Sequence, residues 1–191
     1  MSTGYSGRVT DPVTRVPGPE RRALTIDAAT GVFAARGYFG ASTDQIARAA
    51  GISQPYVVRM FGGKEALFVE VIRRSLDRIM GAFRVALDEH PAEPLPALGA
   101  AYVALAQQEQ VHLILLQAFA ASADPAVGPA ARAGFEELLD FLLHTAGLSA
   151  DEAETFLARG MLINTLMAID LAHGASPDAE DLIERVLETR T

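Results

Sequence analysis

The sequence predicts an all-α fold, and three observations carry that prediction. Apolar residues recur at helical spacing along most of the 191 residues, and no stretch alternates in the way of a strand. A serine followed three residues later by Gln or Glu, the signature of a capped helix start, occurs at Ser42 and at Ser149. Glycines and prolines separate the helical stretches from one another.

The first helix is expected over Pro19–Arg36. Its core face is predicted from the spacing of Leu24, Ala28, Ala29 and Phe33. Gly37 follows as the stop, because glycine adopts the left-handed conformation at a helix end at little cost.

Two short helices are expected next, within residues 42–67. Ser42 and Gln45 form a capping box for the first, and Gly51 ends it. Ser53 caps the second. Two short helices joined by a tight turn are the layout of a helix-turn-helix, the motif that reads duplex DNA from the major groove.

Together with the helix before it, this stretch resembles the DNA-binding domain of the TetR family of transcriptional regulators over roughly residues 20 to 70. The chain departs from the family where a tyrosine usually stands two or three residues before the phenylalanine: it has Val58 and Arg59 there, and its tyrosine is Tyr56. The matching residues are Ala29, Phe33, Gly37, Tyr38, Ser42, Thr43, Ile46, Ala47, Ala50, Gly51, Ile52, Ser53, Phe61, Lys64, Glu65 and Leu67.

The resemblance implies that the second short helix faces the major groove through Gln54, Pro55, Tyr56 and Arg59. Gln54 suits adenine and Arg59 suits guanine or a phosphate. Tyr56 suits a thymine methyl or a phosphate.

Three further residues are expected to hold the DNA backbone. Thr43 opens a helix whose N–H groups suit a phosphate, and Arg48 and Lys64 supply positive charge. The alternative for Arg48 and Lys64 is an ordinary solvated surface. The Gly-Gly-Lys run at 62–64 lacks the spacing of a P-loop.

The remaining chain continues the helical pattern. Pro91, Pro94 and Pro96 mark a loop, and Gly128-Pro129 is a possible interruption. The expected helices are 64–88, about 95–108, about 110–121, a stretch from Asp124-Pro125 to Gly147, one from Ser149 to about His173, and one from Ser176-Pro177 to about Arg190.

Charge divides the chain unevenly. Residues 1–64 carry a net charge of +4 and residues 65–191 a net charge of −12, within a total of −8. We therefore expect a weakly basic arm at 1–18, a DNA-binding domain at 19–66 and an acidic helical domain at 67–191. The family resemblance implies that this last domain serves effector binding and dimerisation. A tail without a role is the alternative for the arm.

Composition excludes several classes of protein. The chain has no cysteine, which excludes disulfides and thiolate metal sites and fits the cytoplasm. No apolar run approaches the length of a membrane span, and the first 18 residues lack the apolar core of a signal peptide. The four histidines lie scattered, without a metal-binding motif. We expect no catalytic residue, no metal and no cofactor.

Two segments of the acidic domain are apolar over most of their surface. We expect the run Val111, Leu113, Ile114, Leu115 and Leu116 to be buried on all sides. The family resemblance implies a homodimer in which the helices near 150–172 and 178–190 form a four-helix bundle with their copies. The alternative is packing within one chain. The apolar residues of the first of these helices are Met161, Leu162, Ile163, Leu166, Met167, Ile169 and Leu171.

The resemblance also implies a pocket for a small effector, whose binding shifts the helix that begins at Lys64. His112 and Asn164 are polar groups on otherwise apolar faces and would orient a ligand. Plain core packing is the alternative for the aromatic residues and for His112. The candidate lining residues are Phe83, Tyr102, His112, Leu116, Phe119, Phe135, Leu139, Met161 and Asn164.

The sequence therefore favours a homodimeric repressor that leaves a near-palindromic DNA operator when a hydrophobic effector binds. A transcriptional activator of the same fold is an alternative. A helical carrier of lipids or small molecules, and a catalytic helical protein, are alternatives from other classes.

Overall fold

The computed structural model describes residues 18–187, and the all-α prediction is confirmed, since this part of the chain contains helices and no strand. The expected arm at 1–18 lies outside the described residues except for Gly18, as does the end of the last expected helix. The elements are α1 (Gly18–Gly40), α2 (Thr43–Ala49), α3 (Gln54–Phe61), α4 (Lys64–Glu89), α5 (Pro94–Glu109), α6 (Val111–Ala120), α7 (Val127–Asp140), the π-helical turn η1 (Phe141–Thr145), α8 (Ala150–Ala168) and α9 (Pro177–Leu187).

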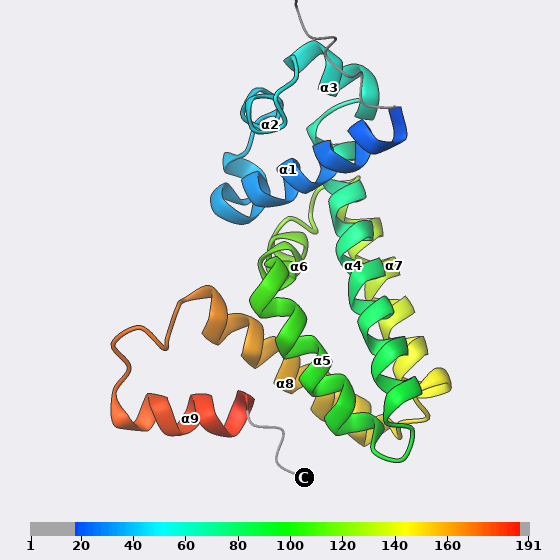
Figure 1. Ribbon diagram of the computed structural model, residues 1–191, viewed down its shortest axis with the longest axis vertical. Coiled ribbons are helices and arrows are strands. Elements are labelled where there is room, and N and C mark those ends of the chain that lie inside the picture. The colour runs from blue at the N-terminus through cyan, green and yellow to red at the C-terminus, as the bar shows by residue number, and fades with distance from the viewer. Residues whose placement is uncertain (1–17, 188–191) are drawn as a thin grey trace, which may run out of the picture.

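The helices form two regions joined by a long rod (Figure 1). Helices α1 to α3 make a small cluster at one end, which we call the reader domain. Helix α4 starts in this cluster and runs into the rest of the molecule, the body, where it packs against α5, α6 and α7. Helix α8 packs on α5 and α6, and α9 packs on α8. The expected boundary at 66/67 falls inside α4.

The start signals in the sequence act as predicted. Both capping boxes are present, with the Ser42 hydroxyl 3.3 Å from the amide of Gln45 and the Ser149 hydroxyl 3.3 Å from the amide of Glu152. Gly37 breaks the helical path of α1, with φ of 69°. Ser53 takes the cap position of α3 without a side-chain bond.

One interruption that the sequence left open does not occur, and one expected boundary was wrong. Gly128-Pro129 does not interrupt a helix, because α7 starts just before this pair, at Val127. Asp124 Oδ1 accepts hydrogen bonds from the amides of Ala126 and Val127 at this helix start. Helix α8 ends at Ala168 and not at His173. There the amide of Leu171 bonds back to the carbonyl of Leu166, and Asp170 turns the chain with φ of 50°.

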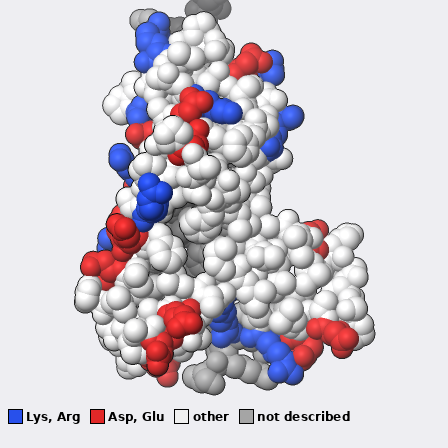
Figure 2. Space-filling view, turned by 180° about the vertical axis from the view of Figure 1, so that it is seen from behind, with Lys and Arg blue, Asp and Glu red and all other residues white. Residues whose placement is uncertain are grey.

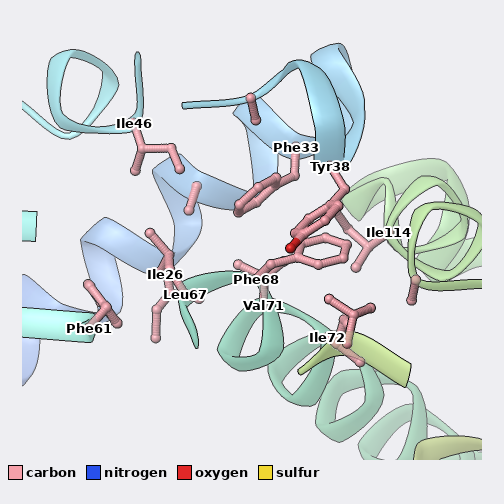
Figure 3. Close-up of a cluster of buried hydrophobic side chains, with 14 of the residues drawn as sticks. Ile26, Phe33, Tyr38, Ile46, Phe61, Leu67, Phe68, Val71, Ile72 and Ile114 are labelled. Atoms are coloured by element: carbon pink, nitrogen blue, oxygen red, sulfur yellow. The ribbon is translucent and has the colours of Figure 1, made fainter. Parts of the chain in front are cut away.

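The molecule has two apolar cores, and α4 contributes to both. The upper core includes Leu67, Phe68 and Val71, and the lower core includes Ile79 and Phe83. In the upper core the Phe68 ring lies 4.6 Å from that of Phe33 and 4.9 Å from that of Tyr38, between α1 and α6 (Figure 3).

One predicted core residue of α1 faces solvent. Leu24 is 54% exposed, whereas Ile26, Ala29 and Phe33 form the buried stripe. Leu24 precedes Ile26 by two residues, which places it about 200° around the helix. The face of α1 was therefore predicted correctly from Ala29 and Phe33 but not from Leu24.

Helix α6 lies between the two cores. Ile114 belongs to the upper core and Val111 to the lower core. The other predicted members, Leu113, Leu115 and Leu116, are partly buried. Full burial on all sides was thus wrong for these three residues, of which Leu115 borders a cavity.

Phe68→Ala should destabilise the whole chain by about 3–5 kcal/mol, because the ring fills the space between α1, α4 and α6. Urea denaturation followed by circular dichroism measures the change in the free energy of unfolding. Phe39→Ala is the matched control, since Phe39 is 75% exposed and should change this quantity by less than about 0.5 kcal/mol. Equal losses for the two variants would contradict this account of the core.

Candidate DNA interface and effector cavity

Helix α3 has one buried face and one open face. Val57 and Phe61 are 0% and 8% exposed and fix the helix to the reader domain. Arg59 and Pro55 lie on the exposed side, and Tyr56 is partly exposed. This is the division that a recognition helix needs, since one face must hold the scaffold while the other meets base edges.

Four of the predicted DNA-contacting residues interact in pairs. The guanidinium of Arg59 lies over the Tyr56 ring, 4.9 Å from its centre. Gln54 Nε2 donates to Thr43 Oγ1 at 3.1 Å, which joins the start of α2 to the start of α3. These contacts restrict the side chains before DNA arrives. The assigned roles at bases and phosphates remain predictions.

Sequence reasoning missed the residue that anchors the end of α3. Arg22 of α1 donates to the carbonyl of Met60 at 3.2 Å, and its guanidinium lies 4.4 Å from the centre of the Phe61 ring. The same side chain pairs with Glu70 of α4 at 3.1 Å. Arg22 therefore ties the recognition helix to both of its neighbours. Its place on a helix face gave no sign of this, because the contacts span up to 48 positions of the chain.

The two predicted phosphate-binding cations have protein partners. Arg48 pairs with Asp44 at 2.5 Å on the exposed face of α2. Lys64 Nζ donates to the carbonyl of Tyr38 at 3.1 Å and lies 4.7 Å from the centre of the Tyr38 ring. A structural role for Lys64 therefore competes with its predicted phosphate contact.

Tyr38 is the main junction between reader domain and body. Its hydroxyl donates to Asp124 Oδ2 at 2.8 Å, and its amide donates to Gln117 Oε1 at 3.1 Å. The preceding Gly37 has φ of 69°, and a Cβ there would lie 2.9 Å from Gln117 Oε1. Only glycine combines this backbone conformation with so close an approach of α6.

The hydrogen bond between Tyr38 and Asp124 shifts the pKa values of the two side chains in opposite directions. Burial raises the pKa of the Tyr38 phenol, and the bond to Asp124 adds to the shift. The Asp124 pKa is lowered, first by the phenol and then by the amide of Ala126. The ionised Asp124 with a neutral Tyr38 is therefore the favoured state at neutral pH.

The body encloses an apolar space of about 90 Å³, which we call the inner cavity. Five helices form it: α4, α5, α6, α7 and α8. Its wall consists of Ile72, Leu76, Ile79, Phe83, Tyr102, Leu115, Ala118, Phe119, Ala131, Gly134, Phe135, Leu138, Phe156, Leu157, Gly160, Met161 and Asn164.

Six of the nine predicted effector residues lie on this wall: Phe83, Tyr102, Phe119, Phe135, Met161 and Asn164. Three do not. Two of them are Leu116 and Leu139. The residues just before them, Leu115 and Leu138, line the cavity instead, because successive side chains on a helix point about 100° apart.

His112 is the third predicted residue that lies off the wall. It is buried, with 6% exposure, and its Nδ1 has no hydrogen-bond partner among the described residues. Burial lowers the pKa of His112 and so favours the neutral ring, although a hydrogen bond to the Ala106 backbone acts in the opposite direction. His112 therefore packs between α6 and the end of α5.

The polar groups of the inner cavity satisfy each other. Tyr102 and Asn164 are 6% and 2% exposed, and the Tyr102 hydroxyl donates to Asn164 Oδ1. Burial raises the pKa of Tyr102 to about 12, although the bond to Asn164 acts in the other direction. A ligand can therefore use these groups only by replacing one of the two partners.

Large apolar side chains remain exposed on the last two helices and the turn between them. Ile169 is 61% exposed, and Leu162 and Leu182 are 37% and 39% exposed. Such side chains gathered on neighbouring elements are typical of a surface that another molecule covers.

Charge on the surface follows the division seen in the sequence. Basic side chains lie along both edges of the reader end in Figure 2, with acidic side chains among them, and acidic side chains are frequent on the body below. A positive reader end suits a phosphate backbone. Within residues 18–187 there is no group of His, Cys, Asp or Glu arranged to hold a metal ion. None of the helices described is both long and apolar enough to cross a bilayer.

The N-terminal part of the chain is similar to known regulatory proteins. Residues 26–71 match the model of the family described as bacterial regulatory proteins, tetR family. The HTH-type transcriptional activator FasR of Mycolicibacterium smegmatis is 40% identical over 73 residues, which are 38% of this chain and 33% of FasR. The match thus spans a third of that relative's length.

Two solved structures share the fold over most of both chains. A TetR-like transcriptional regulator from Rhodococcus sp. RHA1 is 26% identical with a TM-score of 0.65, covering 91% of this chain and 96% of its own. AibR, solved with isovaleryl coenzyme A and operator DNA, is 19% identical with a TM-score of 0.62, covering 83% of this chain and 99% of its own.

Arg59→Ala should weaken binding to a preferred duplex by about 1–3 kcal/mol and relax the preference at one base pair of each half-site. Its exposed guanidinium is the strongest candidate for a guanine contact on α3. Titrations of single-base variants of the duplex by fluorescence anisotropy measure this. Arg48→Ala is the comparison, and it should weaken all duplexes alike and lower the salt slope by about one. An unchanged base preference in Arg59→Ala would show that the base-reading role is wrong.

Asp124→Asn should make the chain less stable at neutral pH and flatten its stability in acid. Because the folded pKa of Asp124 lies below the unfolded value of 3.8, its contribution is complete above that value and is lost as pH falls through the folded pKa. Denaturation midpoints over an acid pH series measure the difference between wild type and variant. The Glu137→Gln variant on the exposed face of α7 should leave the acid profile close to wild type. Parallel profiles for wild type and Asp124→Asn would contradict the bond to Tyr38.

Proposed function

We propose that this chain, which belongs to the TetR family of transcriptional regulators, is a homodimeric repressor that a small apolar effector releases from a near-palindromic operator. Its place of action is then the cytoplasm, where the operator is. The reader domain would bind DNA, the inner cavity would receive the effector, and α6 would connect the two.

The position of α6 is the observation that carries this proposal. Leu115, Ala118 and Phe119 face the inner cavity. On the same ten-residue helix, Gln117 holds the amide of Tyr38 in the reader domain, and Ile114 packs in the upper core. A ligand that displaces the cavity side of α6 therefore also displaces the reader side, because a short helix moves as one rigid piece.

The inner cavity supports a ligand that changes the shape of the body. Its volume of about 90 Å³ is below the roughly 150 Å³ of an engineered cavity that accepts benzene. An effector must therefore push its walls apart. Such an effector would shift the population toward an expanded conformation by as much as its affinity for that conformation exceeds its affinity for the compact one. AibR, a structural neighbour, was solved with an acyl coenzyme A and operator DNA together.

The exposed apolar residues of α8, α9 and the turn at Ile169 support pairing of two chains through these elements. A two-fold axis would then present two copies of α3 to successive major grooves, about 34–36 Å apart. The acidic body would be repelled by phosphate, which favours an approach with the reader end first.

Activation is the second candidate. The relative FasR is named as a transcriptional activator, and it matches this chain over 73 residues. The same reader and effector machinery serves both functions, since the position of the operator relative to the promoter decides between them. A promoter–reporter assay with the selected operator placed over or upstream of the promoter separates the two.

The experiment that tests the proposal is selection of bound sequences from a random duplex pool by the full chain. The expected result is a near-palindromic consensus with half-sites about one helical turn or slightly more apart. Enrichment of a single, non-repeated half-site would contradict the dimer. No enrichment from a pool bound at low salt would contradict the reader assignment.

Gln117→Ala should lower affinity for the selected operator several-fold without changing the order of preference among its variants. Gln117 touches Gly37 and Tyr38 and lies on α6, away from the DNA-facing helix, so it acts on the position of the reader domain. Fluorescence anisotropy at fixed salt measures both quantities. Gln108→Ala, an exposed residue near the end of α5, is the control and should bind as wild type. Wild-type affinity in Gln117→Ala would remove the proposed connection through α6.

A further inference from the structure

The inner cavity is the middle of three spaces that share walls. It borders a space of about 140 Å³ between α5, α8 and α9, the rear cavity, through Tyr102, Phe156 and Gly160. On its other side it borders a surface space of about 400 Å³, the outer groove, through residues that include Phe135 and Met161. The three spaces therefore follow one another from the surface at α7 to the interior beside α9.

The chemistry of the walls is apolar inside and polar at the outer end. Inside, the Tyr102 hydroxyl and Asn164 bond to each other. Arg159, at the rear cavity, donates to the carbonyls of Arg185 and Val186 at the end of α9. A polar ligand group placed in either inner space would therefore lose its hydrogen bonds to water without replacement, whereas an apolar group would not.

Three residues, Tyr102, Phe156 and Gly160, form the junction between the two cavities. Gly160 lies on the wall of both, and a Cβ at this position would meet no atom within 4 Å. The half-buried Phe156 ring, 5.7 Å from the ring of Phe83, and the Tyr102 ring form the rest of the partition. A thin flexible chain can pass such a junction after a turn of one ring, whereas a fused ring system cannot.

The outer groove carries the polar groups that an end group would meet. Ser122, Arg132 and Glu136 line it. No ion pair within residues 18–187 occupies Arg132, so its guanidinium remains available to oxygen acceptors. Glu136, one turn further along α7, repels anions and confines a carboxylate to the Arg132 side.

We propose that the effector is an unbranched acyl chain that runs from the outer groove through the inner cavity into the rear cavity, with its carboxylate or thioester end at Arg132. This inference deepens the proposed function and rests on it. Phe135 and Met161, 44% and 41% exposed, stand at the entrance and move outward as the chain enters. The chain then occupies both cavities along α8 and presses on the side of α6 that carries Leu115 and Phe119.

A chain-length series on the full protein is the first test. Isothermal titration calorimetry with the sodium salts of butyrate, hexanoate, octanoate, decanoate and dodecanoate should show affinity rising about four-fold per methylene through decanoate, because each methylene leaves water for an apolar wall. The compact aromatic acid 2-naphthoate should bind more weakly than decanoate. A plateau at hexanoate, or tighter binding of 2-naphthoate, would overturn the proposal.

Gly160→Leu tests the path itself. Its side chain would fill the junction, and leucine is a better helix former than glycine, so α8 should persist. Affinity for dodecanoate should fall at least about ten-fold, while that for butyrate stays close to wild type. The matched control is Gly81→Leu on α4, where a Cβ likewise meets no atom within 4 Å and which lines none of these spaces. Unchanged dodecanoate binding in Gly160→Leu would overturn the path.

The outer end is tested with Arg132→Gln and three ligands of one chain length. The variant should bind dodecanoate about ten-fold more weakly than wild type and dodecanol equally well. Equal loss for dodecanol and dodecanoate would overturn the assignment of Arg132. Comparison of dodecanoate with dodecanoyl coenzyme A in wild type shows whether a free acid or a thioester is the source.

Failure of this inference can be told from failure of the proposed function. Operator selection uses no ligand, so an operator-binding chain that ignores every acyl ligand would overturn the acyl inference alone. A chain that binds dodecanoate but selects no DNA sequence would overturn the regulator and leave the path intact.

Discussion

The arrangement of reader domain and body depends on one buried tyrosine at the exit of α1. The Tyr38 ring is 2% exposed and packs on Phe68. Its hydroxyl, amide and carbonyl are bonded to Asp124, Gln117 and Lys64, which come from three different parts of the chain. Because every polar group of Tyr38 is engaged, α1 cannot shift relative to α4 and α6 without breaking at least one of these partly buried hydrogen bonds.

This constraint explains how a change deep in the body can reach an exposed helix on the reader domain. Gln117 and the 121–126 turn sit on the body side of the junction, and both adjoin segments that wall the inner cavity. On the reader side, Arg22 links α1 to the end of α3. A contiguous set of contacts therefore joins cavity wall to recognition helix, and its members have fixed partners in this conformation. Under the proposed function, these contacts would carry a displacement of the cavity wall to the recognition helix.

Local features of the fold were predictable from the sequence, and long-range contacts were not. The capping boxes at Ser42 and Ser149 depend on residues three positions apart, so the sequence pattern was enough to find them. Which side of a helix faces the cavity is harder to predict, because an error of one residue places Leu116 on the cavity wall where the structure has Leu115. Tyr38 matched the family pattern, but its bond to Asp124 spans 86 positions, and nothing in the local sequence announces it. Charge asymmetry, by contrast, needs no geometry and indicated the basic end directly.

The continuity of α4 has a consequence for how the molecule unfolds. Its 26 residues extend about 39 Å at 1.5 Å per residue, and its buried side chains belong first to one core and then to the other. Melting either half of this rod would remove structural support from the other half. The reader domain is therefore not an independent folding unit, and the chain should behave as a single cooperative unit in which truncation after residue 66 leaves the three N-terminal helices without Phe68 and Val71 to pack upon.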